Sequence, residues 1–192
     1  MSSFLRYAGA AALLLSFGLF VQALPVLIDV KVPVPVGTDV VSKVLVNLVV
    51  NGEIEAKLKA IAAINTLVEL KALIAVIVTL FKGCADEFLK IGAGVVVDVD
   101  AQASIVACVA AIITLLVKVF AQVSLKLGIT VCAAVFAEVD VCLRALLVNL
   151  NICIDGIVTL VVKALVSVTV AVLVGLKLQV CADILAKAGL AL

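Results

Sequence analysis

The 157 residues that follow Pro35 contain no proline, and most of them are apolar. Because proline interrupts helices and central strands, its absence leaves this part free to form long regular elements. Valine is the commonest residue, and the alternation of Val166 to Val172 is typical of a strand. Apolar stretches of about 20 residues without turn residues are nevertheless too long for strands. The sequence therefore predicts an all-α fold, a helical bundle.

The first 23 residues have the order of a secretory signal peptide. One positive charge, Arg6, precedes a short apolar stretch, and Val21-Gln22-Ala23 places small residues at the two positions that a signal peptidase reads. The alternative is an uncleaved membrane anchor, which is disfavoured because Leu24-Pro25 breaks the segment at once. We expect cleavage after Ala23 and a secreted mature chain.

Residues 24–37 differ from the rest of the mature chain. They contain all three prolines, Pro25, Pro33 and Pro35, within a Val-Lys-Val-Pro-Val-Pro-Val alternation. Proline cannot donate to a sheet, so this segment is predicted to be an extended arm. The sequence thus divides into a signal peptide (1–23), an extended Pro/Val arm (24–37) and a helical apolar domain (38–192).

Helix ends within the apolar domain are marked by capping residues and glycines. Thr38-Asp39 predicts a helix start and Asn51-Gly52 a stop. From Asp100 to Lys126, polar residues largely recur at i, i+4 spacing, which predicts one narrow polar face. The predicted helices that follow the first one span residues 53–82, 85–91, 101–127, 129–150, 154–173 and 176–188, with a connector at 95–99.

Six cysteines in a chain destined for export predict disulfide bonds. Three bridges could form, and six cysteines allow 15 connectivities. Zinc binding is disfavoured because the chain has no histidine and no Cys-x-x-Cys pair. We therefore expect a disulfide-stapled bundle. The candidates for pairing are Cys84, Cys108, Cys132, Cys142, Cys153 and Cys181.

Charge is balanced and sparse. Loss of the signal removes only Arg6 of the 14 basic residues, which leaves 13 basic and 13 acidic residues. A neutral chain has no electrostatic footprint for nucleic acid. Hydrophobic residues make up 67% of the sequence, against about 45–50% apolar residues in ordinary domains. Such an excess indicates that some apolar side chains face lipid, a partner or an interface.

The short uncharged runs disfavour a polytopic membrane protein, and the lack of histidine disfavours an enzyme. Between Lys31 and Lys187, the longest uncharged run, Ala101 to Val117, is shorter than the roughly 20 residues of a membrane span. Without histidine, the Ser-His-Asp and Cys-His arrangements are excluded. The close carboxylate pairs are best explained as solvated helix ends and connectors, so we expect no catalytic residue, no cofactor and no metal. These pairs are Glu53/Glu55, Asp86/Glu87, Asp98/Asp100 and Glu138/Asp140.

The extended Pro/Val arm followed by a cysteine-bearing hydrophobic body resembles the small secreted, hydrophobin-like surface proteins of mushroom-forming fungi. The resemblance lies in architecture and texture over the whole chain. True hydrophobins have eight cysteines with two adjacent pairs, whereas this chain has six and no adjacent pair. The resemblance implies a location in the cell wall or extracellular matrix, and roles in attachment and aerial growth.

The predicted function is that of a secreted structural protein that self-associates or adsorbs at hydrophobic–hydrophilic interfaces. Aliphatic faces such as Val44/Val46/Leu48 and Leu73/Ile77/Leu80 would carry this activity. One alternative is an extracellular carrier of fatty acid or sterol in a cavity between helices. A third hypothesis is a secreted protein that inserts into membranes. The expected partners are hydrophobic surfaces, further copies of the chain, or lipid, and not nucleic acid.

Overall fold

The computed structural model describes residues 28–191, and within this part every regular element is a helix. The predicted all-α class is thereby confirmed. The signal peptide prediction and the first four residues of the arm lie outside the described residues. In chain order the elements are α2 (Val40–Val46), the π-helix η1 (Asn47–Asn51), α3 (Ile54–Ala63), α4 (Leu67–Ile91), α5 (Val99–Leu127), α6 (Ile129–Cys153), α7 (Ile157–Ala164), α8 (Val170–Gly175) and α9 (Gln179–Lys187).

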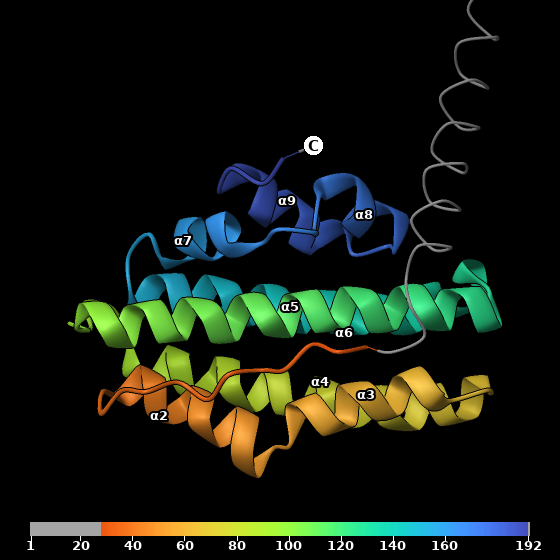
Figure 1. Ribbon diagram of the computed structural model, residues 1–192, viewed down its shortest axis with the longest axis horizontal. Coiled ribbons are helices and arrows are strands. Elements are labelled where there is room, and N and C mark those ends of the chain that lie inside the picture. The colour runs from red at the N-terminus through yellow and green to blue at the C-terminus, as the bar shows by residue number, and fades with distance from the viewer. Residues whose placement is uncertain (1–27, 192) are drawn as a thin grey trace, which may run out of the picture.

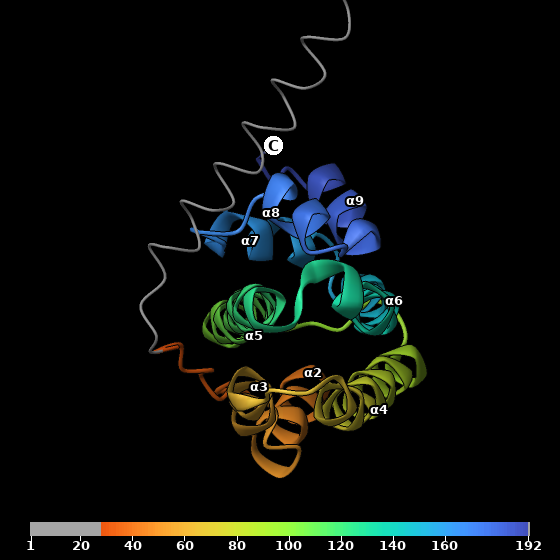
Figure 2. The same ribbon diagram turned by 90° about the vertical axis from the view of Figure 1, so that its right-hand side faces the viewer.

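The helices lie in three layers (Figures 1 and 2). The two long helices α5 and α6 form the central layer. Below them lie α2, α3 and α4, and above them the short helices α7, α8 and α9. A helix in the central layer is therefore covered on two faces, and the Phe120 and Phe136 rings stack between α5 and α6 with centroids 3.9 Å apart.

The layering explains most of the apolar excess. Helix α5 buries residues around nearly its whole circumference, including Ile105, Leu115, Leu116 and Phe120. By length and hydropathy it is the one helix in the described part that could cross a membrane, yet 61% of its most apolar window is buried inside the protein. Two-sided burial thus hides more of the hydrophobic surface than the sequence composition indicated.

Helix boundaries in the lower layer differ from those predicted. The predicted helix 53–82 is divided at Ile64–Thr66, where Thr66 and Glu69 form a capping box that starts α4. Helix α4 then continues through Gly83 to Ile91, so the predicted helix 85–91 is its last part. Packing of Phe81, Cys84 and Phe88 in the core outweighs the low helix propensity of glycine.

The predicted helix 154–173 is also divided in two. Helix α7 ends at Ala164, residues 165–169 are not helical, and Thr169 caps α8 through the backbone N–H of Val172. This break falls on the valine-rich alternation that favoured strand. Local preference therefore prevails over helix formation where the chain turns at the surface, and Val166 is 96% exposed.

The described part of the arm is extended and lies along the body. The Val32 N–H donates to Glu55 Oε2 on α3 at 2.8 Å, and the Val36 N–H donates to Ser104 Oγ on α5 at 3.1 Å. Hydrogen bonds from Lys59 and the Val32 N–H hold the pKa of Glu55 below its usual value. Polar contacts thus hold the arm against two layers of helices. Its Val32 side chain is buried against the core.

A charged side chain from the central layer meets a helix end in each outer layer. Asp140 of α6 accepts the backbone N–H groups of Val180 and Cys181, each at 2.8 Å, at the start of α9. Lys126 of α5 donates to the carbonyl oxygen of Ala62 at 2.7 Å, at the end of α3. Both signs match the helix dipole, which favours anions at the N-terminus and cations at the C-terminus.

All six cysteines are buried as free thiols, so the predicted stapling has no support in this structure. Cys132, Cys142 and Cys153 lie on one helix, α6. Cα atoms ten residues apart on a helix are separated by about 15 Å, whereas a disulfide needs them within about 7 Å. The three α6 cysteines therefore cannot pair with one another, and each could pair only with a cysteine from another helix.

Candidate functional site

The carboxylate pairs singled out in the sequence do not assemble into one cleft. Glu53 and Glu55 form ion pairs with Lys57 and Lys59 one turn along α3. Asp98 is the N-cap of α5, where it accepts the N–H of Ala101 at 2.8 Å. Asp140 differs from the rest, because it is only 2% exposed and serves α9. The remaining members of the four pairs, Asp86, Glu87, Asp100 and Glu138, are exposed.

The cysteines are chemically protected. Burial raises the pKa of the Cys108 thiol to about 12. The pKa of the Cys84 thiol is also raised to about 12, mainly by burial and further by the nearby Cys108 and Glu87. Burial is also the main cause that raises the pKa of the Cys181 thiol, which donates to the Asp140 carbonyl oxygen at 3.4 Å. Since the thiolate is the reactive form, these thiols are poor nucleophiles. Among residues 28–191, no three Cys, Asp or Glu side chains are grouped as metal ligands.

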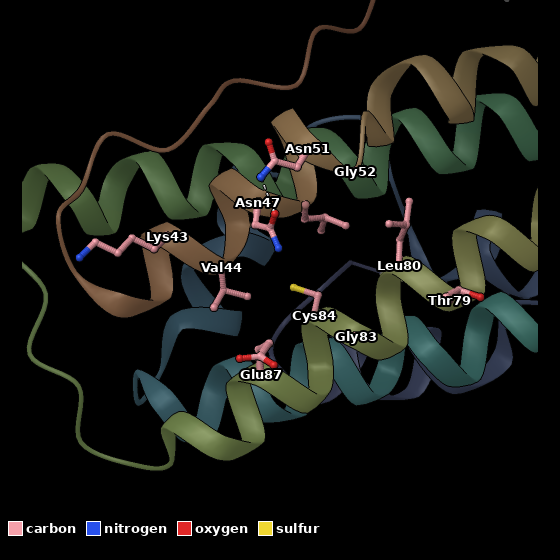
Figure 3. A pocket seen from close by; sticks show the side chains of 11 residues that line it. Lys43, Val44, Asn47, Asn51, Gly52, Thr79, Leu80, Gly83, Cys84 and Glu87 are labelled. Atoms are coloured by element: carbon pink, nitrogen blue, oxygen red, sulfur yellow. Dashed lines mark hydrogen bonds between the residues drawn. The ribbon is translucent and has the colours of Figure 1, made fainter.

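An open groove of about 520 Å³ lies between α2–η1 and α4 (Figure 3). Val44, Leu48 and Leu80 line it with aliphatic surface, and Cys84 points its sulfur into it. Its polar lining consists of Lys43, Asn47, Asn51, Thr79 and Glu87, and the glycines Gly52 and Gly83 complete it.

A second hollow, of about 430 Å³, lies where α6 ends and meets α7 and α9. Its lining includes Asn151, Asp155, Thr159 and Lys187. The Asn151 side chain already accepts the N–H of Val158 at 3.3 Å, so it serves the turn between α6 and α7.

Helices α4 and α6 end and α5 begins at the same end of the molecule, on the left in Figure 1, and several aliphatic residues of these terminal turns, the α4–α5 connector and the arm are exposed. The N–H of Val95 donates to the Cys153 carbonyl oxygen at 2.9 Å and ties the α4–α5 connector to α6. We call this region the apolar end. It comprises Val36 (72% exposed), Leu89 (63%), Val96 (92%), Val99 (79%) and Ile152 (47%).

Acidic groups accompany the apolar end. Asp98 and Asp100 flank Val99, and Asp155 follows Ile152. All three are exposed, and none of them forms an ion pair within the described residues. The surface there combines aliphatic and anionic side chains, an arrangement that disfavours contact with anionic headgroups.

The aliphatic faces named from the sequence are mostly turned inward. Leu48 and Ile77 are buried, and Val44, Leu73 and Leu80 pack against the core. The aliphatic faces predicted from the sequence are therefore not the exposed ones, because regular helical spacing marks the side of a helix that packs. The residues of the apolar end lie in a connector, in the arm and in terminal turns, where periodicity is absent. A run of three valines outside a helix, Val95 to Val97, was the available signal.

Comparisons with known protein families, with curated proteins and with solved structures find no match to this chain.

Proposed function

We propose that this protein is a secreted structural protein, outside the cell or in its wall, that adsorbs at boundaries between apolar and aqueous phases and associates with further copies of itself. The apolar end carries the proposal, because Val96 and Val99 are almost fully exposed although a two-sided core was available to hide them. Monomeric soluble proteins seldom leave clustered aliphatic side chains in water without a use.

Several other features support an uncharged apolar boundary as the target. The exposed carboxylates of Asp98, Asp100 and Asp155 disfavour anionic membranes. A mature chain of zero net charge also has little self-repulsion and associates readily. The likeness to hydrophobin-like surface proteins points in the same direction, as do the signal-like residues 1–23. Reactive thiolates and histidine are lacking, and we propose no catalytic role.

Disulfide stapling stays part of this proposal, with the connectivity limited by the fold. Three bridges require that Cys84, Cys108 and Cys181 each pair with a different α6 cysteine, since those on α6 cannot pair together. A Cys84–Cys108 bridge would leave at least two α6 thiols free. Export through an oxidising compartment is the condition under which such bridges form and persist.

Surface tension of the purified mature protein tests the adsorption. We expect the wild-type protein to lower the tension of water and a Val96→Ser/Val99→Ser variant to adsorb more slowly, because about 25 cal/mol is lost for each Å² of apolar area removed from the boundary. A matched control, Val68→Ser/Val131→Ser, changes exposed valines at the opposite ends of α4 and α6. If the wild-type protein leaves the tension unchanged, or if both variants behave alike, the apolar end is not the adsorbing surface.

A further inference from the structure

The groove between α2–η1 and α4 contains a glycine that the fold itself does not require. Gly83 lies inside the 25-residue helix α4, and a Cβ atom there would meet no atom within 4 Å. Glycine inside a helix is less favourable than alanine by about 1 kcal/mol. Close packing does not account for it, because the neighbouring space is open. Gly83 lines the groove, so its missing side chain widens the groove (Figure 3).

The opposite wall of the groove, formed by α2 and η1, contains a π-helical turn and a second glycine. Helix α2 continues into the π-helix η1, and π-helical turns within α-helices frequently occur at functional sites. Gly52 ends η1 in close contact, since a Cβ there would lie 2.5 Å from the Leu48 carbonyl oxygen and 3.2 Å from the Leu80 side chain. One glycine thus lets η1 approach α4, while the other keeps space open beside it.

The chemistry of the groove is that of an amphiphile site. Its aliphatic lining and the uncharged sulfur of Cys84, whether as a thiol or in a disulfide, suit a hydrocarbon chain. Lys43 is exposed on this wall and forms no ion pair within the described residues, whereas Glu87 is engaged by Lys90 at 2.7 Å. The Lys43 side chain points away from the groove in Figure 3, and because the ammonium has no partner in the described residues, it can turn toward an anion at the mouth of the groove.

The size also fits. Lys43 and Gly52 are nine residues apart, which corresponds to about 13 Å along a helix. The volume of about 520 Å³ lies within the range of about 300–1,000 Å³ of small-molecule sites. We propose that this groove binds a single-chain amphiphile with a carboxylate headgroup, the headgroup at Lys43 and the chain along Leu48, Leu80 and Cys84. This site shares no residue with the apolar end, so it stands or falls independently of surface adsorption.

Calorimetric titration of the mature protein with decanoate tests the site. Gly83→Leu places its Cβ atom in open space and the rest of its side chain in the groove, and leucine favours the helix. We expect it to weaken decanoate binding about tenfold or more, the loss for about two methylene groups expelled from apolar surface. Ala72→Leu adds the same side chain at an exposed position of α4 outside the groove, and we expect it to leave binding unchanged. Thermal unfolding of both variants shows that each is folded.

The headgroup assignment is tested in the same titrations. Lys43→Gln should weaken decanoate binding about two- to fivefold, as expected for an exposed ion pair, and leave decanol binding unchanged. Lys71→Gln, on an exposed part of α4 outside the groove, is the matched control. The proposal is overturned if wild-type protein does not bind decanoate, if Gly83→Leu binds it as well as wild type does, or if decyltrimethylammonium binds as tightly as decanoate.

Discussion

The two outer layers are attached to the central pair by the same device used at opposite helix ends. Above, the carboxylate of Asp140 meets the N-terminus of α9, and below, the ammonium group of Lys126 meets the C-terminus of α3. The environments differ. Asp140 is 2% exposed and holds two N–H groups, whereas Lys126 is exposed to solvent and its second carbonyl contact, to Ile64, is long at 3.4 Å.

From this difference we expect burial, more than charge, to decide how much such a contact contributes to stability. In the upper layer, loss of the carboxylate leaves the buried N–H of Cys181 and the partly buried N–H of Val180 without their partner. In the lower layer water can hydrate the α3 carbonyl groups when the lysine leaves. Helices α2, α3 and α4 bury large apolar residues against the centre, and so does α7, whereas α8 buries only Leu173 and α9 only Cys181, Ala182 and Leu185. We therefore expect the α8–α9 part of the upper layer to depend strongly on Asp140.

Disulfide bonds would alter this comparison most. If Cys181 pairs with a cysteine of α6, the upper layer is joined covalently to the centre, and loss of that bridge should cost about 2–5 kcal/mol. We expect intact mass spectrometry of the secreted protein, unfolded and alkylated without reduction, to show no modified cysteine. Peptide mapping should then place one α6 cysteine in every bridge.

Two or more alkylated cysteines would reject full pairing. Alkylation of all six after unfolding without reductant would mean that the thiols are free, as in the structure, and that the upper layer depends on noncovalent contacts alone. The reduced protein, alkylated under the same conditions, gives the reference mass for six modifications.

Removal of Asp140 should have the next largest effect. Asp140→Ala abolishes two hydrogen bonds to an ionised group, and we expect it to lower the free energy of unfolding by about 2–4 kcal/mol. Amide exchange should show that protection is lost first in α9. Asp140→Asn, which keeps one acceptor oxygen, should lie between Asp140→Ala and wild type.

Glu138→Ala is the matched control for this experiment, because Glu138 lies on the same helix and is exposed. We expect it to change the stability by no more than about 0.5 kcal/mol. If Asp140→Ala unfolds at the same denaturant concentration as this control, the upper layer is held by its apolar contacts instead.

The sequence predicted the class of fold because proline-free apolar runs and capping residues are local signals. The ends of η1 and α5 followed from Asn51-Gly52 and Gly128. The polar face predicted along α5 is used, since Ser104, Gln122 and Lys126 all bind neighbouring segments. The division at Ile64–Thr66 was predictable as well. Thr66 followed by Glu69 is a capping-box pattern, which marks a new helix start inside the single helix predicted over residues 53–82.

Contacts between distant segments could not be predicted in this way. Asp140 was interpreted as half of a surface carboxylate pair, although it shares the buried side of α6 with Phe136 and Leu143. Its partners lie 40 and 41 residues further along the chain, and nothing near Asp140 indicates them. The groove was equally hidden, since a glycine inside a helix signals a site only after the space beside it is known.

Lys126 should show the smallest effect and so completes the comparison. Lys126→Ala removes an exposed cation from the C-terminus of α3, and we expect a loss of about 0.3–1 kcal/mol in the free energy of unfolding. Because the contact is exposed, the loss should shrink as salt is added, whereas the effect of Asp140→Ala should hardly depend on salt. Urea unfolding of both variants at low and high ionic strength measures this difference. Lys118→Ala, on the same helix, controls for the change in net charge. If Lys126→Ala costs as much as Asp140→Ala at every salt concentration, burial is not what distinguishes the two contacts, and the charge at the helix end is sufficient to hold either layer.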